Sequence, residues 1–175
     1  MLNQKEKKII EIIKKDGIGV MPTDTLYGLI GSAFSEKAIN RIYKLKKRSK
    51  KKKLIILISS LKDLKKFKIK INKKQAKILK EFWPGKVSII LNEIAFRLPK
   101  NKKLLEILKK TGPLVAPSAN PEGLKPAENI KQAKNYFGHK VDFYLSGENL
   151  KSKPSILIEI NKNSEIKVLR GKIKL

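Results

Sequence analysis

Two stretches of the chain carry hydroxyl side chains beside small residues. The first runs from Pro22 to Leu29 (PTDTLYGL) and the second from Ala116 to Asn120 (APSAN). Each follows a short apolar segment typical of a strand, and α/β proteins tend to build their pockets where strands end. Small residues also let the backbone approach a ligand closely. Each stretch is therefore a candidate binding segment, although a turn that satisfies only its own backbone explains either one equally well when taken alone.

A third stretch, Lys46 to Lys53 (KKRSKKKK), is densely cationic. Such a stretch could cradle a triphosphate, because phosphoryl transfer depends mainly on neutralising the charge on phosphate oxygens. A lysine run at a helix C-terminus is also an ordinary solvated loop, favoured there by the helix dipole. We favour that second interpretation for Lys47, Lys50 and Lys51.

The arginines are more informative than the lysines. The chain has 42 lysines and arginines, and only Arg41, Arg48, Arg97 and Arg170 are arginines. A guanidinium grips phosphate or carboxylate through two parallel bonds, which an ammonium cannot do. Each arginine in so lysine-rich a chain is therefore a candidate ligand-binding residue, with chance retention an adequate explanation for Arg41 on a predicted helix.

Several kinds of site are excluded by the sequence. It contains neither a G-x-x-x-x-G-K-(S/T) nor a G-x-G-x-x-G motif, so no Walker or Rossmann nucleotide site is expected. There is no cysteine, which excludes disulfides and thiolate metal sites, and His139 is the sole histidine. We expect no metal site built from side chains, an exposed loop without a role for His139, and a core position for Trp83.

Composition and charge set wider limits. The chain has 175 residues, 41% of them hydrophobic, which suffices for one domain with a real core. Its longest apolar runs are too short to cross a bilayer, and the N-terminus lacks the apolar core of a signal peptide, so we expect a cytoplasmic protein with no membrane partner. The formal net charge of +27 attracts polyanions such as RNA or nucleotides, although a lysine-biased proteome explains the excess equally well.

The elements that must position these residues alternate along the chain. Apolar periodicity and capping residues predict helices at 5–15, 35–46, 72–83, 102–110 and 127–137. Short apolar runs predict strands at 18–21, 54–58, 87–91, 94–97, 114–116, 141–145, 156–160 and 166–169. Interleaved strands and helices indicate an α/β domain with a mixed sheet. No internal repeat or linker divides the chain, so a single domain is expected.

Taken in order, these stretches and other short segments resemble the motifs of the YrdC/Sua5 family, the threonylcarbamoyl-AMP synthases. The matches are Pro22 to Leu29 with P-T-(D/E)-T-(V/L)-Y-G-L, Lys46-Lys47-Arg48 with K-G-R-P, Trp83-Pro84-Gly85 with W-P-G-P, Arg97-Leu98-Pro99 with R-x-P, Ala116 to Asn120 with A-P-S-A-N, Pro154-Ser155 with P-S-T, and Leu169-Arg170-Gly171 with L-R-x-G. One match alone is unspecific, but the ordered set, spanning almost the whole chain, is specific. Departures from the family pattern affect loop rigidity more than chemistry, because the charged and hydroxyl positions remain: they are Lys47 in place of glycine, Ser49, Lys53 and Lys86 in place of prolines, and Ile156 in place of threonine.

The resemblance implies one YrdC-like domain over residues 1–175, of the short form without an extra C-terminal domain. Its fold would be a twisted open mixed β-sheet with flanking helices and a basic concave groove that holds ATP and threonine. By position in the motifs, the threonine-binding residues would be Thr25, Arg97, Ala116 and Ser155. The ATP-binding residues would be Arg48, Lys52, Ser118, Asn120 and Arg170, with Lys46 and Arg48 as the catalytic residues near the phosphates.

The resemblance also implies the reaction. The amine of L-threonine captures bicarbonate or CO2, and the resulting carbamate attacks the α-phosphorus of ATP to form threonylcarbamoyl-AMP and pyrophosphate. Arg97 would grip the threonine carboxylate while Lys46, Arg48 and Arg170 offset charge on the phosphates. No side chain is an evident nucleophile or base, so we expect catalysis by positioning and charge neutralisation. Mg²⁺ would accompany the nucleotide with few protein ligands. The adenylate would pass to downstream proteins that form N6-threonylcarbamoyladenosine (t6A) in tRNA.

Two other functions remain open from the sequence. The first is a non-catalytic module whose basic groove holds double-stranded RNA or tRNA, because family members can bind RNA. The second is carbamoyl transfer from carbamoyl phosphate, in which related domains form parts of much larger proteins. The zinc-finger and kinase-like modules of those larger proteins do not occur in this sequence, which disfavours the second function.

Overall fold

The computed structural model describes residues 2–173. Its helices are α1 (Gln4–Lys14), α2 (Glu36–Lys46), the 3-10 helix η1 (Leu61–Phe67), α3 (Lys73–Phe82), α4 (Lys102–Thr111) and α5 (Ile130–Phe137). Its strands are β1 (Gly19–Pro22), β2 (Tyr27–Ser32), β3 (Ile55–Leu57), β4 (Val87–Leu91), β5 (Ile94–Arg97), β6 (Leu114–Val115), β7 (Phe143–Tyr144), β8 (Ile156–Ile160) and β9 (Ile166–Arg170).

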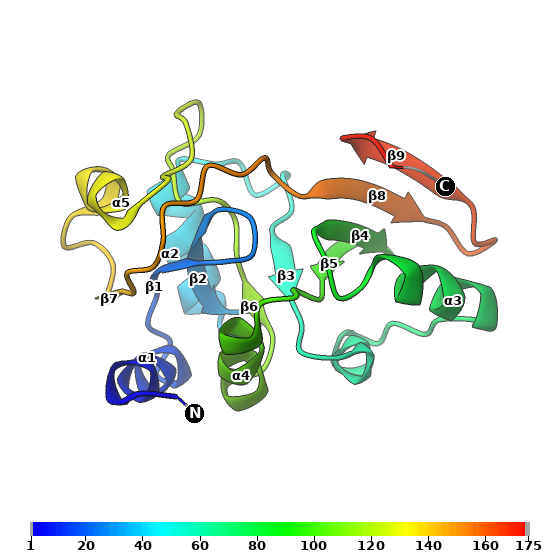
Figure 1. Ribbon diagram of the computed structural model, residues 1–175, viewed down its shortest axis with the longest axis horizontal. Helices are drawn as coiled ribbons and strands as arrows, with labels where there is room; N and C mark the ends of the chain where they lie inside the picture. The colour runs from blue at the N-terminus through cyan, green and yellow to red at the C-terminus, as the bar shows by residue number, and fades with distance from the viewer. Residues whose placement is uncertain (1, 174–175) are drawn as a thin grey trace.

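The strands of this described part form one open sheet in the order β7-β1-β2-β6-β3-β5-β4-β8-β9 (Figure 1). The pairs β1–β7, β3–β5 and β4–β8 are parallel, and the other pairs are antiparallel. The sheet is therefore mixed. The predicted α/β fold with a mixed sheet and flanking helices is confirmed.

Helices pack on both faces of the sheet. On one face α2, α3 and α5 share an apolar cluster with strand residues such as Val20 and Leu29. On the other face α1 and α4 pack against the next residues of the same strands, Met21 and Ile30. Successive side chains of a strand point to opposite faces, so one hairpin supplies both cores. In Figure 1 α1 and α4 lie side by side on this second face.

Asparagine and serine caps set where the helices begin. The predicted caps Ser35 and Asn72 both accept a hydrogen bond from the first turn of their helix, at Ala38 N and Gln75 N. Helix α5 begins at Ile130 rather than at the predicted residue 127, because the Asn129 side chain accepts from Gln132 N at 3.0 Å and so fixes the N-cap there.

Strand β2 and helix η1 are absent from the sequence prediction. Strand β2 contains Gly28 and Gly31, which lower strand propensity and hide the pattern. Gly31 is needed for packing, since a Cβ there would lie 3.0–3.1 Å from side-chain atoms of Ile18, Ala38 and Ile42. Helix η1 is a lysine-rich 3-10 segment and so lacks the 3.6-residue period used to recognise helices.

Two smaller expectations can be compared with the structure. Trp83 is buried, and its indole Nε1 donates to Val87 O at 2.7 Å, so its core position is confirmed. Within residues 2–173 no helix has both the length and the apolar character needed to cross a membrane.

Candidate functional site

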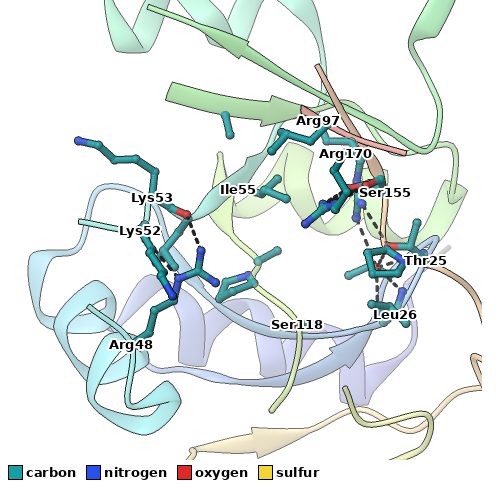
Figure 2. Close-up of a pocket in the computed structure, with 18 of the residues that line it drawn as sticks. Thr25, Leu26, Arg48, Lys52, Lys53, Ile55, Arg97, Ser118, Ser155 and Arg170 are labelled. Atoms are coloured by element: carbon teal, nitrogen blue, oxygen red, sulfur yellow. Dashed lines mark hydrogen bonds between the residues drawn. The ribbon is translucent and has the colours of Figure 1, made fainter. Parts of the chain in front are cut away.

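A cavity of about 380 Å³ lies where loops from both halves of the sheet meet (Figure 2). Its basic lining residues are Arg48, Lys52, Lys53, Arg97 and Arg170. Its hydroxyl-bearing lining residues are Thr23, Thr25, Tyr27, Ser118 and Ser155. The described residues that line it include no aspartate or glutamate. This space, called the central cavity below, is therefore cationic and rich in hydroxyl groups.

Backbone hydrogen bonds bring the two hydroxyl-bearing stretches together. The β1–β2 hairpin closes over Thr23 to Leu26, with Thr23 N donating to Leu26 O at 3.0 Å. Gly28 forms a β-bridge with Ser118, and Ala119 N donates to Tyr27 O at 2.8 Å. The stretch after β6 thus continues the sheet beside β2. Each stretch forms a turn, and residues of both stretches line the same cavity.

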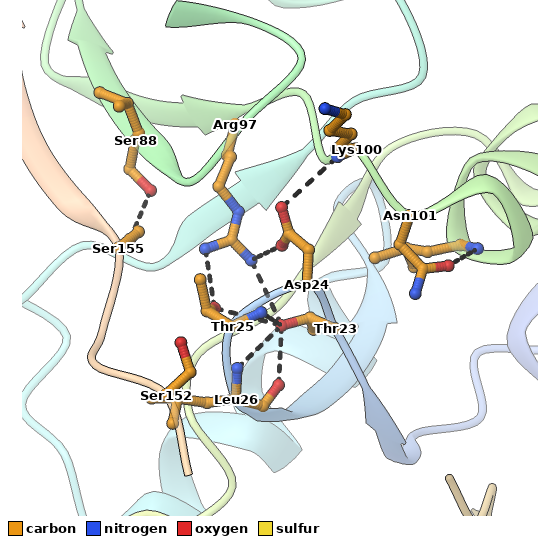
Figure 3. Close-up of polar contacts among 12 residues, drawn as sticks. Thr23, Asp24, Thr25, Leu26, Ser88, Arg97, Lys100, Asn101, Ser152 and Ser155 are labelled. Carbon is orange, nitrogen blue, oxygen red and sulfur yellow. Dashed lines mark hydrogen bonds and ion pairs between the residues drawn. The ribbon is translucent and has the colours of Figure 1, made fainter. Parts of the chain in front are cut away.

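A buried arginine cluster consists of Thr23, Asp24, Thr25 and Arg97 (Figure 3), and all of these except Asp24 line one end of the cavity. Arg97 ends β5, is 3% exposed, and its Nη2 lies 3.0 Å from Asp24 Oδ1. Its Nη1 donates to Thr25 Oγ1 at 3.1 Å and its Nη2 to Thr23 Oγ1 at 3.4 Å. Burial lowers the pKa of the Arg97 guanidinium, and the neighbouring Asp24 carboxylate opposes that shift.

Two buried atoms of this cluster have no hydrogen-bond partner among the described residues. They are Arg97 Nε and Asp24 Oδ1, the latter in contact with the guanidinium but outside hydrogen-bond geometry. Unpartnered buried polar atoms are rare and costly in folded proteins. The cluster is therefore incomplete without a further polar group.

Ser155, the residue before β8, is bonded to both β9 and β4. Arg170 on β9 donates from Nε and Nη2 to Ser155 O, at 3.0 and 2.9 Å. The Ser155 hydroxyl lies 2.9 Å from the hydroxyl of Ser88 on β4, and Ser88 is fully buried. Ser88 was missed by sequence reasoning. The only signal for it is a serine inside the apolar run Val87–Leu91.

The opposite end of the cavity is an exposed cationic edge made of Arg48, Lys52 and Lys53. The Arg48 guanidinium donates to the carbonyls of Lys52 and Lys53, both at 3.3 Å, so the segment after α2 curls around it. The Lys52 ammonium, 60% exposed in its side chain, pairs with Glu122. The hydrogen bond from Lys52 lowers the pKa of the Glu122 carboxyl.

Eight of the ten predicted site residues line the cavity: Thr25, Arg48, Lys52, Arg97, Ala116, Ser118, Ser155 and Arg170. Lys46 and Asn120 do not. The Lys46 ammonium is buried behind the cavity wall and bonds to Ser118 O, Asn120 O and Asn120 Oδ1. Burial is the main cause that lowers the pKa of Lys46 to about 8, and the positive charge of Arg48 adds to it.

Thr23 and Asp24 also take part in the site without having been chosen from the sequence. Both belong to the candidate stretch that begins at Pro22, so the signal was present but could not separate them from Thr25. The fourth arginine, Arg41, has a structural partner: its guanidinium donates two bonds to the Asp142 carboxylate, which also accepts from Ile18 N. His139 is exposed, as expected. Among residues 2–173 no group of three or more histidine or acidic side chains could hold a metal ion.

These features define a class: an α/β protein with a cationic, hydroxyl-lined cavity at the meeting point of its strand ends. A family model for the Sua5, YciO and YrdC proteins, described as "Telomere recombination", matches residues 11–171. The chain therefore belongs to the Sua5/YciO/YrdC family. A putative threonylcarbamoyl-AMP synthase of Methanocaldococcus jannaschii is 30% identical to it, over 99% of this chain and 91% of that protein.

Solved structures show the same fold. Pyrococcus abyssi Sua5, solved in complex with L-threonine, superposes with a TM-score of 0.84 at 24% identity over 94% of this chain. Escherichia coli YciO gives a TM-score of 0.84 at 21% identity and is covered over 87% of its length. The present chain spans about half the length of Sua5, 53%.

Proposed function

We propose that the protein is an L-threonylcarbamoyladenylate synthase, which makes threonylcarbamoyl-AMP and pyrophosphate from L-threonine, bicarbonate or CO2, and ATP. One observation carries the proposal: a single cavity has a buried arginine with hydroxyl groups at one end, exposed cations at the other, and no acidic side chain among its described lining residues. Such a cavity suits a ligand pair with a carboxylate at one end and phosphates at the other. Relatives named as synthases of this compound support the same reaction.

The buried arginine cluster suits the threonine. Thr23 Oγ1 donates its proton to Leu26 O at 2.7 Å, so in the 3.3 Å contact between the two hydroxyls Thr25 is the donor. Thr25 Oγ1 also accepts from Arg97, and its proton can turn from Thr23 to a ligand. The unpartnered Arg97 Nε is a further donor. We assign the threonine carboxylate to Arg97 and Thr25, with Ala116 and Ser155 completing that end.

The cationic edge suits the nucleotide. Arg48, Lys52 and Arg170 line the cavity and would offset the negative charge of the phosphates, with Ser118 supplying a hydroxyl. Magnesium would enter bound to the phosphates and would rely on them and on water for its ligands, because the described lining residues offer no carboxylate.

The chemistry requires positioning more than acid–base groups. The threonine nitrogen forms a bond to the carbon of CO2 and loses a proton, which gives a carbamate. A carbamate oxygen then bonds to the α-phosphorus, and the bond from that phosphorus to the bridging oxygen breaks to release pyrophosphate. Holding the carbamate and the α-phosphorus side by side turns an encounter between two anions into a step within one complex. The cations then stabilise the charge that develops.

The test is pyrophosphate release that requires both threonine and bicarbonate, with the adenylate identified by its mass. Pyrophosphate release that is independent of threonine would point to hydrolysis of ATP to AMP, and no release at all would contradict the proposal. In a tRNA-modification pathway the product would pass to proteins that form t6A.

The net charge of +27 supports a second candidate, a module that binds double-stranded RNA or tRNA without catalysis. This candidate predicts RNA binding that weakens steeply with added salt, together with no threonine-dependent pyrophosphate release. The two functions are thus separated by one enzymatic assay and one salt titration.

A further inference from the structure

Lys46 lies at the point where two walls of the central cavity meet. One wall is the cationic edge, which begins two residues after Lys46. The other is the segment 117–122, called the wall loop below, which carries Ser118 and Asn120. Lys46 is the last residue of α2 and is 2% exposed. Its main-chain carbonyl accepts from Glu122 N at 2.7 Å, so its backbone already fastens the end of the wall loop to the helix.

The Lys46 side chain fastens the beginning of the same loop. Its Nζ lies 2.6 Å from Ser118 O, 2.8 Å from Asn120 O and 3.3 Å from Asn120 Oδ1. A lysine ammonium has three N–H donors and no acceptor. Three acceptors in reach therefore occupy all of its donors, and none is left for a phosphate oxygen in the cavity.

The Asn120 side chain connects the Lys46 ammonium to the Ser118 hydroxyl. Its Nδ2 donates to Pro121 O at 3.0 Å and Leu124 O at 2.7 Å, which fixes the direction of the amide. Its Oδ1 is thereby turned toward the Lys46 ammonium and accepts from the Ser118 hydroxyl at 2.7 Å. A lining hydroxyl of the cavity is thus held through Asn120 by a cation that does not itself line the cavity.

We propose that Lys46 is a positioning residue: its ammonium ties the wall loop to the end of α2 and sets the Ser118 hydroxyl, without touching the nucleotide. The main-chain atoms of the loop rely on this tie, because Asn120 O accepts from the Lys46 ammonium in a buried contact, whereas Ser118 O also accepts from Asn120 N at 3.0 Å. The proposal deepens the proposed function, since it concerns the same cavity, but the tie itself exists in the free protein.

The first test is therefore made without substrate. Lys46→Met keeps the length of the side chain and removes the ammonium. Native-state hydrogen exchange should then speed up by about tenfold or more at Glu122 and Ala127, whose amides donate to Lys46 O and Ala119 O. The amide of Ile158, in β8 on the far side of the cavity, should be unchanged.

The matched control is Lys52→Met, which removes an ammonium that does line the cavity and bonds only to Glu122. It should leave exchange at Ala127 in the free protein unchanged and raise the KM for ATP. Lys46→Met should combine faster loop exchange with a lower kcat, because the wall is misplaced in the complex as well. Equal exchange in wild type and Lys46→Met, with activity lost, would overturn the proposal in favour of direct contact with the nucleotide.

Asn120→Ala covers the case in which Lys46→Met does not fold. It removes the side-chain acceptor together with the two Nδ2 bonds to Pro121 O and Leu124 O, and it leaves both main-chain carbonyls on the ammonium, so it should give the same exchange pattern with a smaller rise. No change in exchange at Glu122 and Ala127 in Asn120→Ala would contradict the relay through Asn120. Because exchange needs no substrate, a protein that released no pyrophosphate would refute the proposed function and leave this test intact.

Discussion

The two ends of the central cavity supply positive charge in different ways. At the buried arginine cluster, Arg97 is 3% exposed and faces the Asp24 carboxylate, so its charge is largely balanced and its direction is fixed. At the cationic edge, Lys52 and Lys53 stand in solvent, and the partner of Lys52 is the surface residue Glu122. One end presents hydrogen-bond donors in fixed positions, and the other contributes a positive electrostatic potential from exposed side chains.

The difference suits the two anions of the proposed reaction, which have separate requirements. A carboxylate is small and needs geometry, which a buried and hydrogen-bonded guanidinium provides. A polyphosphate carries several charges and tolerates many poses, so flexible exposed cations suffice and leave room for release. The predictions that follow test this contrast, beginning with the largest effect.

Asp24→Asn should have the largest effect. It leaves the buried Arg97 guanidinium without a counter-ion, and breaking a buried pair from one side costs about 3 kcal/mol or more in the free energy of unfolding. Urea unfolding measures the loss. The matched control at the other end is Glu122→Gln, which frees the exposed Lys52 and should leave the urea midpoint unchanged. A similar, small effect of both substitutions would remove the contrast between the two ends.

Arg48→Lys keeps the charge of the cationic edge and removes its fork. Arg48 donates from Nε and Nη2 to the carbonyls of Lys52 and Lys53. A lysine ammonium lacks this fixed fork, so it cannot keep both bonds and also point at the phosphates in the same way. We expect kcat/KM for threonine-dependent pyrophosphate release to fall by about tenfold to a hundredfold. Lys50→Arg, a conservative change in the same loop outside the cavity, should leave it unchanged. Undiminished release in Arg48→Lys would show that charge alone suffices there.

Salt should separate the two ends by several-fold. Raising the ionic strength from about 50 mM to about 500 mM shortens the screening length from about 14 Å to about 4 Å, which weakens exposed cations far more than buried ones. The Kd for a non-hydrolysable ATP analogue should therefore rise several-fold while the Kd for threonine changes little, both by calorimetry. Equal weakening of the binding of both ligands would mean that both ends act through long-range electrostatic attraction.

The last prediction concerns the pH dependence of stability and tests Lys46, which lies between the two ends. Burial lowers the pKa of Lys46 to about 8 from an ordinary 10.5, so between these values the unfolded chain binds more protons than the folded one. Stability contributed by this residue therefore rises with pH across that window. The free energy of unfolding of wild type, relative to Lys46→Met, should increase from about pH 7 to about pH 10. Parallel curves would show that Lys46 keeps an ordinary pKa.

Much of the fold could be read from the sequence because its signals are local. Apolar periods and capping residues such as Ser35 and Asn72 predict helices within a few residues. Strand β2 escaped because the close approach of Gly31 to Ile18 and Ala38 is a tertiary requirement that removes the local signal. The boundary of α5 was misjudged because Asn129, not an earlier residue, supplies the cap.

Most residues that line the cavity could also be predicted from the sequence, but the contacts between them could not. Motif order places Thr25, Arg97 and Ser118 together without any geometry. The pairing of Asp24 with Arg97 joins residues far apart in the chain, and the burial of Ser88 beside Ser155 depends on the register of β4 and β8. The contacts of Lys46 are made mainly to main-chain carbonyls, which carry no sequence signal at all.

Strand β9 lies at the edge of the sheet, so its attachment to the sheet can report whether a ligand occupies the cavity. Arg170 reaches the cavity from a strand whose only described neighbour in the sheet is β8, so this guanidinium is present only while that edge is docked. A ligand that contacts Arg170 binds the docked form alone and must, by mass action, hold the strand in place. Filling of the cavity should therefore protect β9 from a protease, although Thr25 in another wall of the cavity lies far from β9 in the sequence.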